Sequence, residues 1–226
     1  MPRRAQLLAS LPVVLLLVLA GVVTLRATAS DAVSEAGWCE RYAASHAAAA
    51  ALPLTGQGRR VVVIGDSWSS GWRLDDPAAA WPAQLPGRVS VDGFPGSGFS
   101  ETASPCGKVS FADRAATAGA GADALVVVEG GLNDFDQTYD AVRRGFVRLV
   151  GELQGADLVV VGPAPAPARL AGARRVDGWL RSLSEEYAVR YVSAISLDLP
   201  YLPDGLHPTR AGHREFGDFV AAALAG

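Results

Sequence analysis

Short apolar runs recur along the chain and predict buried strands. They cover residues 61–64, 89–92, 125–128, 158–161 and 191–193. The third and fourth runs end at Gly130-Gly131 and Gly162-Pro163, and such turn-forming pairs mark the ends of strands. Runs this short and this rich in valine are typical of strands that are buried on both faces of a sheet.

Between these strands, apolar residues recur at the spacing of one helix face. The pattern predicts helices over residues 142–153, 176–187 and 216–224, the last with Thr209 as its N-cap. Residues 45–52 are a weaker candidate for a short helix. Strands that alternate with helices predict an α/β fold, a three-layer α/β/α sandwich with a mainly parallel sheet.

The first 30 residues resemble a targeting segment. Arg3 and Arg4 precede an uncharged run over residues 7–25, and Ala27-Thr28-Ala29 follows with small side chains. This is the pattern of a secretory signal peptide cleaved near Ala29, but the run is also long enough for an uncleaved signal anchor that spans the membrane. Because of this length, we favour the anchor. Both interpretations predict an extracytoplasmic protein, either secreted or anchored to the outer face of the cell membrane.

The rest of the chain is predicted to be an Ala-rich connector over residues 31–58 and one folded domain over residues 59–226. Half of the residues are hydrophobic and 19% are charged, which is typical of a folded protein. The net charge is −3, and it becomes −6 without the basic N-terminal segment. Because phosphate binding requires a basic face, this charge argues against nucleic acid as a partner.

Polar residues follow the predicted strands where a parallel sheet places its binding sites. Ser67 closes the turn after the first strand, and Asp204 and His207 lie three residues apart near the C-terminus. A serine hydroxyl is a weak nucleophile that needs a base and a group to orient that base. We therefore predict Ser67 as nucleophile, His207 as general base and acid, and Asp204 as the carboxylate that orients the imidazole.

Four motifs in order resemble the SGNH hydrolase family, also called GDSL esterases and lipases. They are Gly65-Asp66-Ser67, the glycine-rich segment 93–98, Gly131-Leu132-Asn133-Asp134, and Asp204-Gly205-Leu206-His207-Pro208. The resemblance runs from Val61 to the C-terminus. It implies a flavodoxin-like sandwich that hydrolyses esters through an acyl-enzyme, with no metal and no organic cofactor. One departure is Trp68, which stands where the family often has leucine or a small residue and is interpreted either as a pocket wall or as core.

A tetrahedral intermediate needs hydrogen-bond donors for its oxyanion. The backbone N–H of Ser67 is one predicted donor. The resemblance implies two more, the backbone N–H of Gly96 and the side chain of Asn133, with Gly98 as the alternative to Gly96. We interpret Asp66 as a structural residue that caps its own turn.

Cys39 and Cys106 predict one disulfide, because an even number of cysteines in an exported protein favours pairing. Two buried free thiols are the alternative. Neither cysteine has a histidine nearby in the sequence, which makes a zinc site unfavourable.

The predicted function is hydrolysis of a small-molecule or polysaccharide ester, with lipid esters, aryl esters and carbohydrate O-acetyl groups as candidates. Two other functions suit the same motifs. One is acyl transfer to a sugar hydroxyl, and the other is a catalytically silent glycan-binding module. The sequence pattern leaves the acyl chain, the alcohol and the oligomeric state open.

Overall fold

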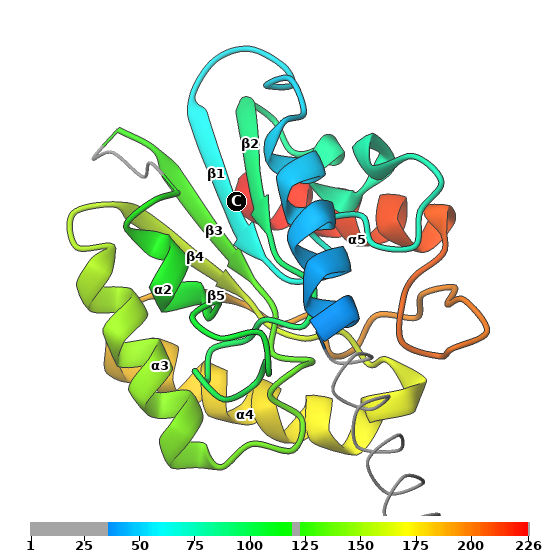
Figure 1. Cartoon of the computed structure of the whole chain (residues 1–226). Helices are drawn as coiled ribbons and strands as arrows, with labels where there is room; N and C mark the ends of the chain where they lie inside the picture. Colours follow the sequence, from blue (N-terminus) through cyan, green and yellow to red (C-terminus); the bar gives the residue numbers. More distant parts are fainter. Residues whose placement is uncertain (1–35, 119–122, 226) are drawn as a thin grey trace, which may run out of the picture. The chain divides into compact units, whose positions relative to one another are not determined.

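The computed structural model describes residues 36–118 and 123–225 (Figure 1). The chain divides into two compact units, and the second runs from Arg41 to Gly226. The first unit is described only over its helical residues 36–40. The predicted targeting segment, residues 1–30, lies outside the described residues. Among the residues that are described, no helix is both long enough and apolar enough to cross a bilayer.

A five-stranded sheet with the order β2-β1-β3-β4-β5 forms the centre of the second unit. All neighbouring strands pair in parallel. The strands are β1 (Arg60–Gly65), β2 (Arg88–Gly93), β3 (Leu125–Glu129), β4 (Asp157–Val161) and β5 (Arg190–Val192). Each contains one of the predicted runs except for the last residue of the fifth, so the prediction of a parallel sheet is confirmed.

Helices cover both faces of this sheet (Figure 1). Successive side chains of a strand point to opposite faces. In β1, Val61 and Val63 therefore pack into one hydrophobic cluster, while Val62 and Ile64 pack into another. The first cluster includes side chains of α5 (Arg210–Ala225) and of the 3-10 turn η2 (Trp81–Gln84); the second includes side chains of α2 (Phe111–Ala115), α3 (Tyr139–Glu152) and α4 (Leu170–Glu186). This is the predicted three-layer α/β/α sandwich.

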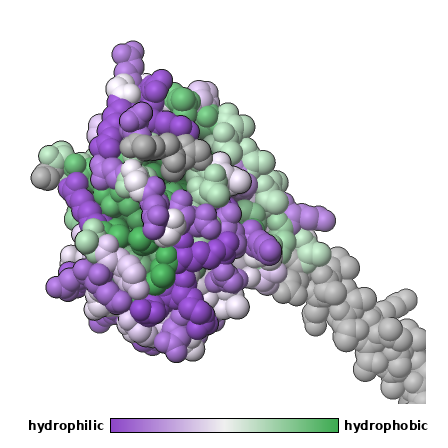
Figure 2. Space-filling model, turned by 90° about the vertical axis from the view of Figure 1, so that its left-hand side faces the viewer, coloured by the Kyte–Doolittle hydropathy of each residue, from purple (hydrophilic) through white to green (hydrophobic). Residues whose placement is uncertain are grey.

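The outer faces of the helices are polar, since α3 and α4 each bury one apolar side. The face drawn in Figure 2 is accordingly mostly hydrophilic, with smaller hydrophobic patches between polar side chains. The predicted cap of α5 is present, because the Thr209 hydroxyl accepts the Gly212 N–H at 3.2 Å.

The helix before β1 is longer than expected and covers residues 36–50 instead of 45–52. Within the second unit, its Tyr42 ring lies edge-on against Trp72 at 5.2 Å and against Phe94 at 6.4 Å. Residues 41–50 therefore pack against the domain that was predicted to begin at residue 59. Both cysteines of the chain, Cys39 and Cys106, are disulfide-bonded, as predicted.

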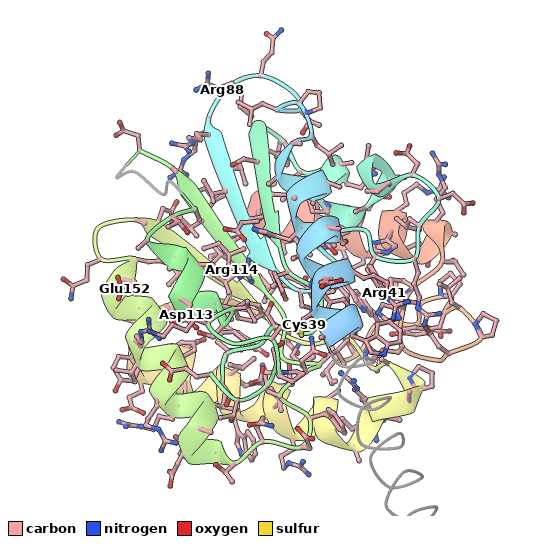
Figure 3. All side chains as sticks on the ribbon, in the orientation of Figure 1. Cys39, Arg41, Arg88, Asp113, Arg114 and Glu152 are labelled. Carbon is pink, nitrogen blue, oxygen red and sulfur yellow. The ribbon has the colours of Figure 1, made fainter. Side chains whose placement is uncertain are left out.

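A buried arginine ties α2 to the carboxyl ends of β1 and β2 (Figure 3). Arg114 donates to the Gly65 carbonyl at 2.9 Å and to the Ser97 hydroxyl at 3.0 Å, and it pairs with Asp92. These contacts join the strand that leads to Ser67 with the glycine-rich segment 93–98. The two motifs are thus held together by a charged side chain that neither of them contains.

Candidate active site

A tight turn at the end of β1 presents Ser67. Asp66 organises this turn, because its carboxylate oxygen Oδ1 accepts the Trp68 N–H at 2.9 Å and its backbone carbonyl accepts the Ser70 N–H at 3.1 Å. Asp66 is itself buried, as is most of Ser67. These contacts are those of a residue that caps its own turn, which is the role expected for Asp66.

The structure brings Ser67, His207 and Asp204 into one hydrogen-bonded chain. The Ser67 hydroxyl oxygen lies 3.1 Å from Nε2 of His207. On the other side of the ring, Nδ1 lies 2.8 Å from Oδ2 of Asp204. The second carboxylate oxygen of Asp204 accepts the backbone N–H groups of Leu206 and His207, both at 2.9 Å. A single turn therefore fixes the carboxylate and the imidazole that it contacts.

The protonation states of His207 and Asp204 suit proton transfer from Ser67. Burial lowers the pKa of His207 below its usual value, and it outweighs the opposing pull of Asp204. Burial acts to raise the pKa of Asp204, but the hydrogen bonds from the His207 backbone and ring and from the Leu206 N–H together lower it to about 2. At neutral pH the carboxylate is therefore ionised and the imidazole is neutral, with Nε2 able to accept a proton.

The loop that carries His207 is fastened from two sides. The Trp68 indole N–H donates to the Leu206 carbonyl at 3.2 Å, and the Ala168 N–H donates to the Gly205 carbonyl at 2.9 Å. Trp68 is 1% exposed and packs edge-on against Phe216 at 5.2 Å. Of the two interpretations offered for Trp68, the structure shows core. The residue after the nucleophile thus braces the histidine loop.

Asn133 follows β3 and reaches the two earlier motifs. Its amide nitrogen donates to Oδ2 of Asp66 at 3.1 Å and to the Ser97 carbonyl at 2.9 Å. Its amide oxygen accepts the Arg169 guanidinium at 2.7 Å. Asn133 therefore lies beside the Ser67 turn with every hydrogen-bonding group of its side chain engaged.

Gly96 and Gly98, the two glycines predicted as alternatives for the second backbone donor, both lie in the segment after β2. Within the described part of the chain, the N–H groups of Ser67, Gly96 and Gly98 donate to no residue. The Ser97 carbonyl points at Asn133 and its peptide is trans, so the Gly98 N–H points away from that side chain. A side chain on Gly98 would also meet Oδ2 of Asp134 at 2.5 Å, which shows that this glycine serves packing.

Sequence reasoning missed Glu129, a buried acid directly behind the Ser67 turn. Glu129 accepts the Ser69 hydroxyl at 2.7 Å, and the Trp81 indole N–H donates to the same hydroxyl at 3.1 Å. Burial, with the nearby Asp66, raises its pKa well above the usual value. The sequence feature that could have indicated this residue is an acid at the end of an otherwise apolar predicted strand. The described residues contain no group of three or more His, Cys, Asp or Glu side chains placed to hold a metal ion.

Fold and geometry together define an α/β protein with a hydrogen-bonded Ser-His-Asp set at the carboxyl ends of its strands. The family model for the GDSL-like lipase/acylhydrolase family matches residues 63–215. The chain belongs to this family of ester hydrolases. The resemblance seen in the four motifs is therefore confirmed.

Solved structures share the fold. A carbohydrate acetylesterase from Sinorhizobium meliloti is 21% identical, with a TM-score of 0.60 over 74% of this chain and 99% of that one. An aryl esterase from M. smegmatis is 20% identical, with the same TM-score and the same shares of the two chains. No curated protein sequence matches the chain.

Proposed function

We propose that the protein is a serine esterase that hydrolyses carboxylic esters through an acyl-enzyme on Ser67. The observation that carries this proposal is the 3.1 Å separation between the Ser67 hydroxyl and Nε2 of His207, whose other ring nitrogen contacts Asp204. Family membership supports the same reaction class. A hydroxyl in contact with an oriented, neutral imidazole has what it needs to attack an ester carbonyl.

In the proposed mechanism, His207 takes the Ser67 proton as the hydroxyl oxygen attacks. Asp204 stabilises the imidazolium that forms. The oxyanion accepts hydrogen bonds from the Ser67 and Gly96 N–H groups and from the Asn133 amide. Because both amide hydrogens of Asn133 already have acceptors, this last bond requires the amide to share or release the Ser97 carbonyl.

The intermediate then collapses as His207 protonates the alcohol that leaves, and the acyl group stays on Ser67. A water molecule gives its proton to the same imidazole and attacks the acyl-enzyme. The second tetrahedral intermediate breaks down to release the acid, and Ser67 recovers its proton from His207. Each proton moves through Nε2, so one histidine serves both half-reactions.

We propose short acyl esters of carbohydrates as the substrate class, with aryl acetates as convenient assay substrates. The similar structures, a carbohydrate acetylesterase and an aryl esterase, support this choice. A second support is the Tyr42 ring, which lies 3.2 Å from the position that a side chain on Gly96 would occupy and provides an aromatic surface beside the proposed oxyanion site. Aromatic faces suit the apolar side of a sugar ring or an aryl group.

We also propose that the domain acts outside the cytoplasm, secreted or anchored by its N-terminal segment. The signal-like sequence of residues 1–30 supports this, and so does the disulfide state of both cysteines, since disulfides persist in oxidising compartments. Protease digestion of intact cells that express the full chain tests this location. Complete protection of the chain would contradict it.

Ser67→Ala tests the proposed nucleophile. We expect hydrolysis of p-nitrophenyl acetate to fall at least ~10³-fold, because the attacking oxygen is lost while the oxyanion donors remain. A fluorophosphonate probe should label the wild type at Ser67, as mapped by mass spectrometry, and should not label the variant. Ser90→Ala, which removes a serine on β2, is the matched control and should keep full activity. Retained activity or labelling in Ser67→Ala would overturn the proposed function.

A further inference from the structure

We propose that Arg169 is a positioning residue that fixes the side-chain amide of Asn133 for oxyanion stabilisation. This inference rests on the proposed function. Arg169 closes the 3-10 turn η3 (Pro167–Arg169), directly before α4. It lies outside all four motifs, and nothing in the family resemblance assigns it a role.

The guanidinium of Arg169 is held against the loop after β3. Its Nη1 donates to Oδ1 of Asn133 at 2.7 Å and to the Leu132 carbonyl at 3.0 Å. Its carbon Cζ lies 4.3 Å from the centre of the Phe135 ring, within the range of a cation–π contact. Contacts with three residues of one loop, Leu132, Asn133 and Phe135, therefore define the position of this side chain.

The contact matters because the two ends of an amide have the same shape but opposite hydrogen-bonding character. In the observed orientation, the amide oxygen of Asn133 faces the Arg169 donor, and the nitrogen faces Asp66 and the Ser97 carbonyl. A rotated amide would place N–H against a guanidinium and its oxygen against two acceptors. Arg169 thus penalises the orientation in which Asn133 could not donate.

Arg169 also differs from the other partners of Asn133 in what happens during the reaction. Asp66 and the Ser97 carbonyl accept from the nitrogen, so they compete with an oxyanion for the same hydrogens. The Arg169 bond is made to the opposite end of the amide and persists while the nitrogen changes partners. A cation on the amide oxygen also polarises the N–H groups, which strengthens their donation.

The segment that presents Arg169 contacts the histidine loop as well. Its Ala168 N–H donates to the Gly205 carbonyl at 2.9 Å, between Asp204 and His207. The prolines at 163, 165 and 167 restrict the backbone of this segment. One stiff segment therefore supports both the oxyanion side chain and the acid–base loop.

A purely structural role, anchoring of the loop after β3, is the competing explanation, and the chain offers a matched control for it. Arg175 on α4 donates to the Phe135 carbonyl at 2.6 Å, so it contacts the same loop without reaching Asn133. If anchoring alone matters, Arg175→Gln and Arg169→Gln should have similar effects.

The kinetic test compares R169Q, R175Q, N133A and the double variant R169Q/N133A with p-nitrophenyl acetate. We expect R169Q to lower kcat by about 10–100-fold with KM changed less than about 3-fold. Removal of one oxyanion donor lowers kcat by about 10²–10³-fold, and in R169Q the Asn133 donor is still present but less well oriented. R175Q should stay within about 2-fold of the wild type. The double variant should be no slower than N133A, since Arg169 acts through Asn133. Multiplicative losses, or R169Q at wild-type kcat, would overturn the proposal.

A second measurement separates this inference from the proposed function. In ¹H–¹⁵N spectra of the full chain, the Asn133 side-chain NH₂ pair, assigned by its loss in N133A, should shift and exchange faster in R169Q but not in R175Q. An unchanged pair would refute the positioning role whether or not the protein hydrolyses esters. Absence of esterase activity in the wild type would instead refute the proposed function. Should R169Q fail to fold, R169K, which keeps the charge but not the fork of donors, should show intermediate changes in both readouts, and wild-type values there would refute the role.

Discussion

The two carboxylate oxygens of Asp204 have different roles, since one stabilises the turn and the other orients the imidazole of His207. One of its carboxylate oxygens accepts two backbone N–H groups of its own turn, and the other contacts the His207 ring. Arg73 also approaches the latter oxygen, with Nε at 3.5 Å. The carboxylate therefore sets the orientation of the imidazole and its protonation at once.

Asp204→Asn separates these effects. The amide can still accept the two backbone N–H groups, but it no longer favours the imidazolium or the tautomer with hydrogen on Nδ1. We expect kcat to fall by about 10²–10⁴-fold. Asp204 acts to raise the pKa of His207 against the effect of burial, so its removal should lower that pKa and move the acid limb of the kcat/KM profile to lower pH.

A pH–rate profile from pH 4 to 9 measures both changes. In the wild type, the acid limb should already lie below the ordinary histidine value of 6.5, because the pKa of His207 is lowered. Asp75→Asn, a change at an exposed acid, should leave the profile in place. A shift to higher pH in Asp204→Asn would contradict the assigned role of the carboxylate.

Helix α3 packs directly on the segment that follows the second motif. Gly145 is the contact point, because a side-chain carbon there would lie 1.8 Å from the Phe99 carbonyl oxygen. The N–H groups of Phe99 and Ser100 donate to the carboxylate of Asp134 at 3.0 and 2.8 Å, which ties the same segment to the third motif. The helix thus supports the loops that hold Asn133.

Gly145→Ala should destabilise the fold by about 2–4 kcal/mol, because α3 must move away from backbone that cannot yield. Gly151→Ala on the same helix is the control. No atom lies within 4 Å of the side chain it would add, and we expect it to stabilise by about 0.5–1 kcal/mol through the better helix propensity of alanine. Urea unfolding of both variants measures the difference. Equal stabilities would show that the helix and the loop adjust freely to each other.

The buried carboxyl groups near the strand ends include Asp66, Glu129 and Asp134. Burial raises the pKa of Asp66 to about 7 and that of Asp134 to about 6, although backbone N–H groups act in the opposite direction. A carboxyl whose pKa is higher in the folded than in the unfolded protein stabilises the fold at low pH. That contribution is lost as the pH rises through the folded pKa.

Asp66→Asn should therefore change how stability depends on pH. Between about pH 4 and pH 7, the wild type should lose about 2–4 kcal/mol relative to the variant, since Asp66 must give up its proton inside the protein. Groups remote from Asp66 titrate alike in both proteins and cancel in the comparison, and any fixed cost of the amide adds only a constant offset. Glu129, whose pKa depends on Asp66, contributes to the difference as part of the same buried cluster. Urea unfolding at several pH values gives the slope. Parallel curves would show that Asp66 is ionised throughout.

Much of the fold was predictable because it follows from local patterns. Runs of three or four buried apolar residues specify strands, as in 61–64 and 125–128, and the helical spacing specifies α3, α4 and α5. The length of the helix over residues 36–50 was underestimated, because its alanine-rich sequence shows little periodicity of apolar and polar residues. Its extent depends on packing that no local window contains.

Local sequence patterns were enough to predict the order of the elements, the family and the residues that carry the proposed chemistry. Strand and helix periods are local, and a Ser, an Asn and an Asp-His pair stand out at strand ends. Contacts between distant parts of the chain were needed to show that Trp68 is core, that Glu129 lies behind the Ser67 turn and that Arg169 contacts Asn133. The physical reason is that burial and hydrogen-bond direction depend on neighbours far away in the chain, which folding alone brings into contact.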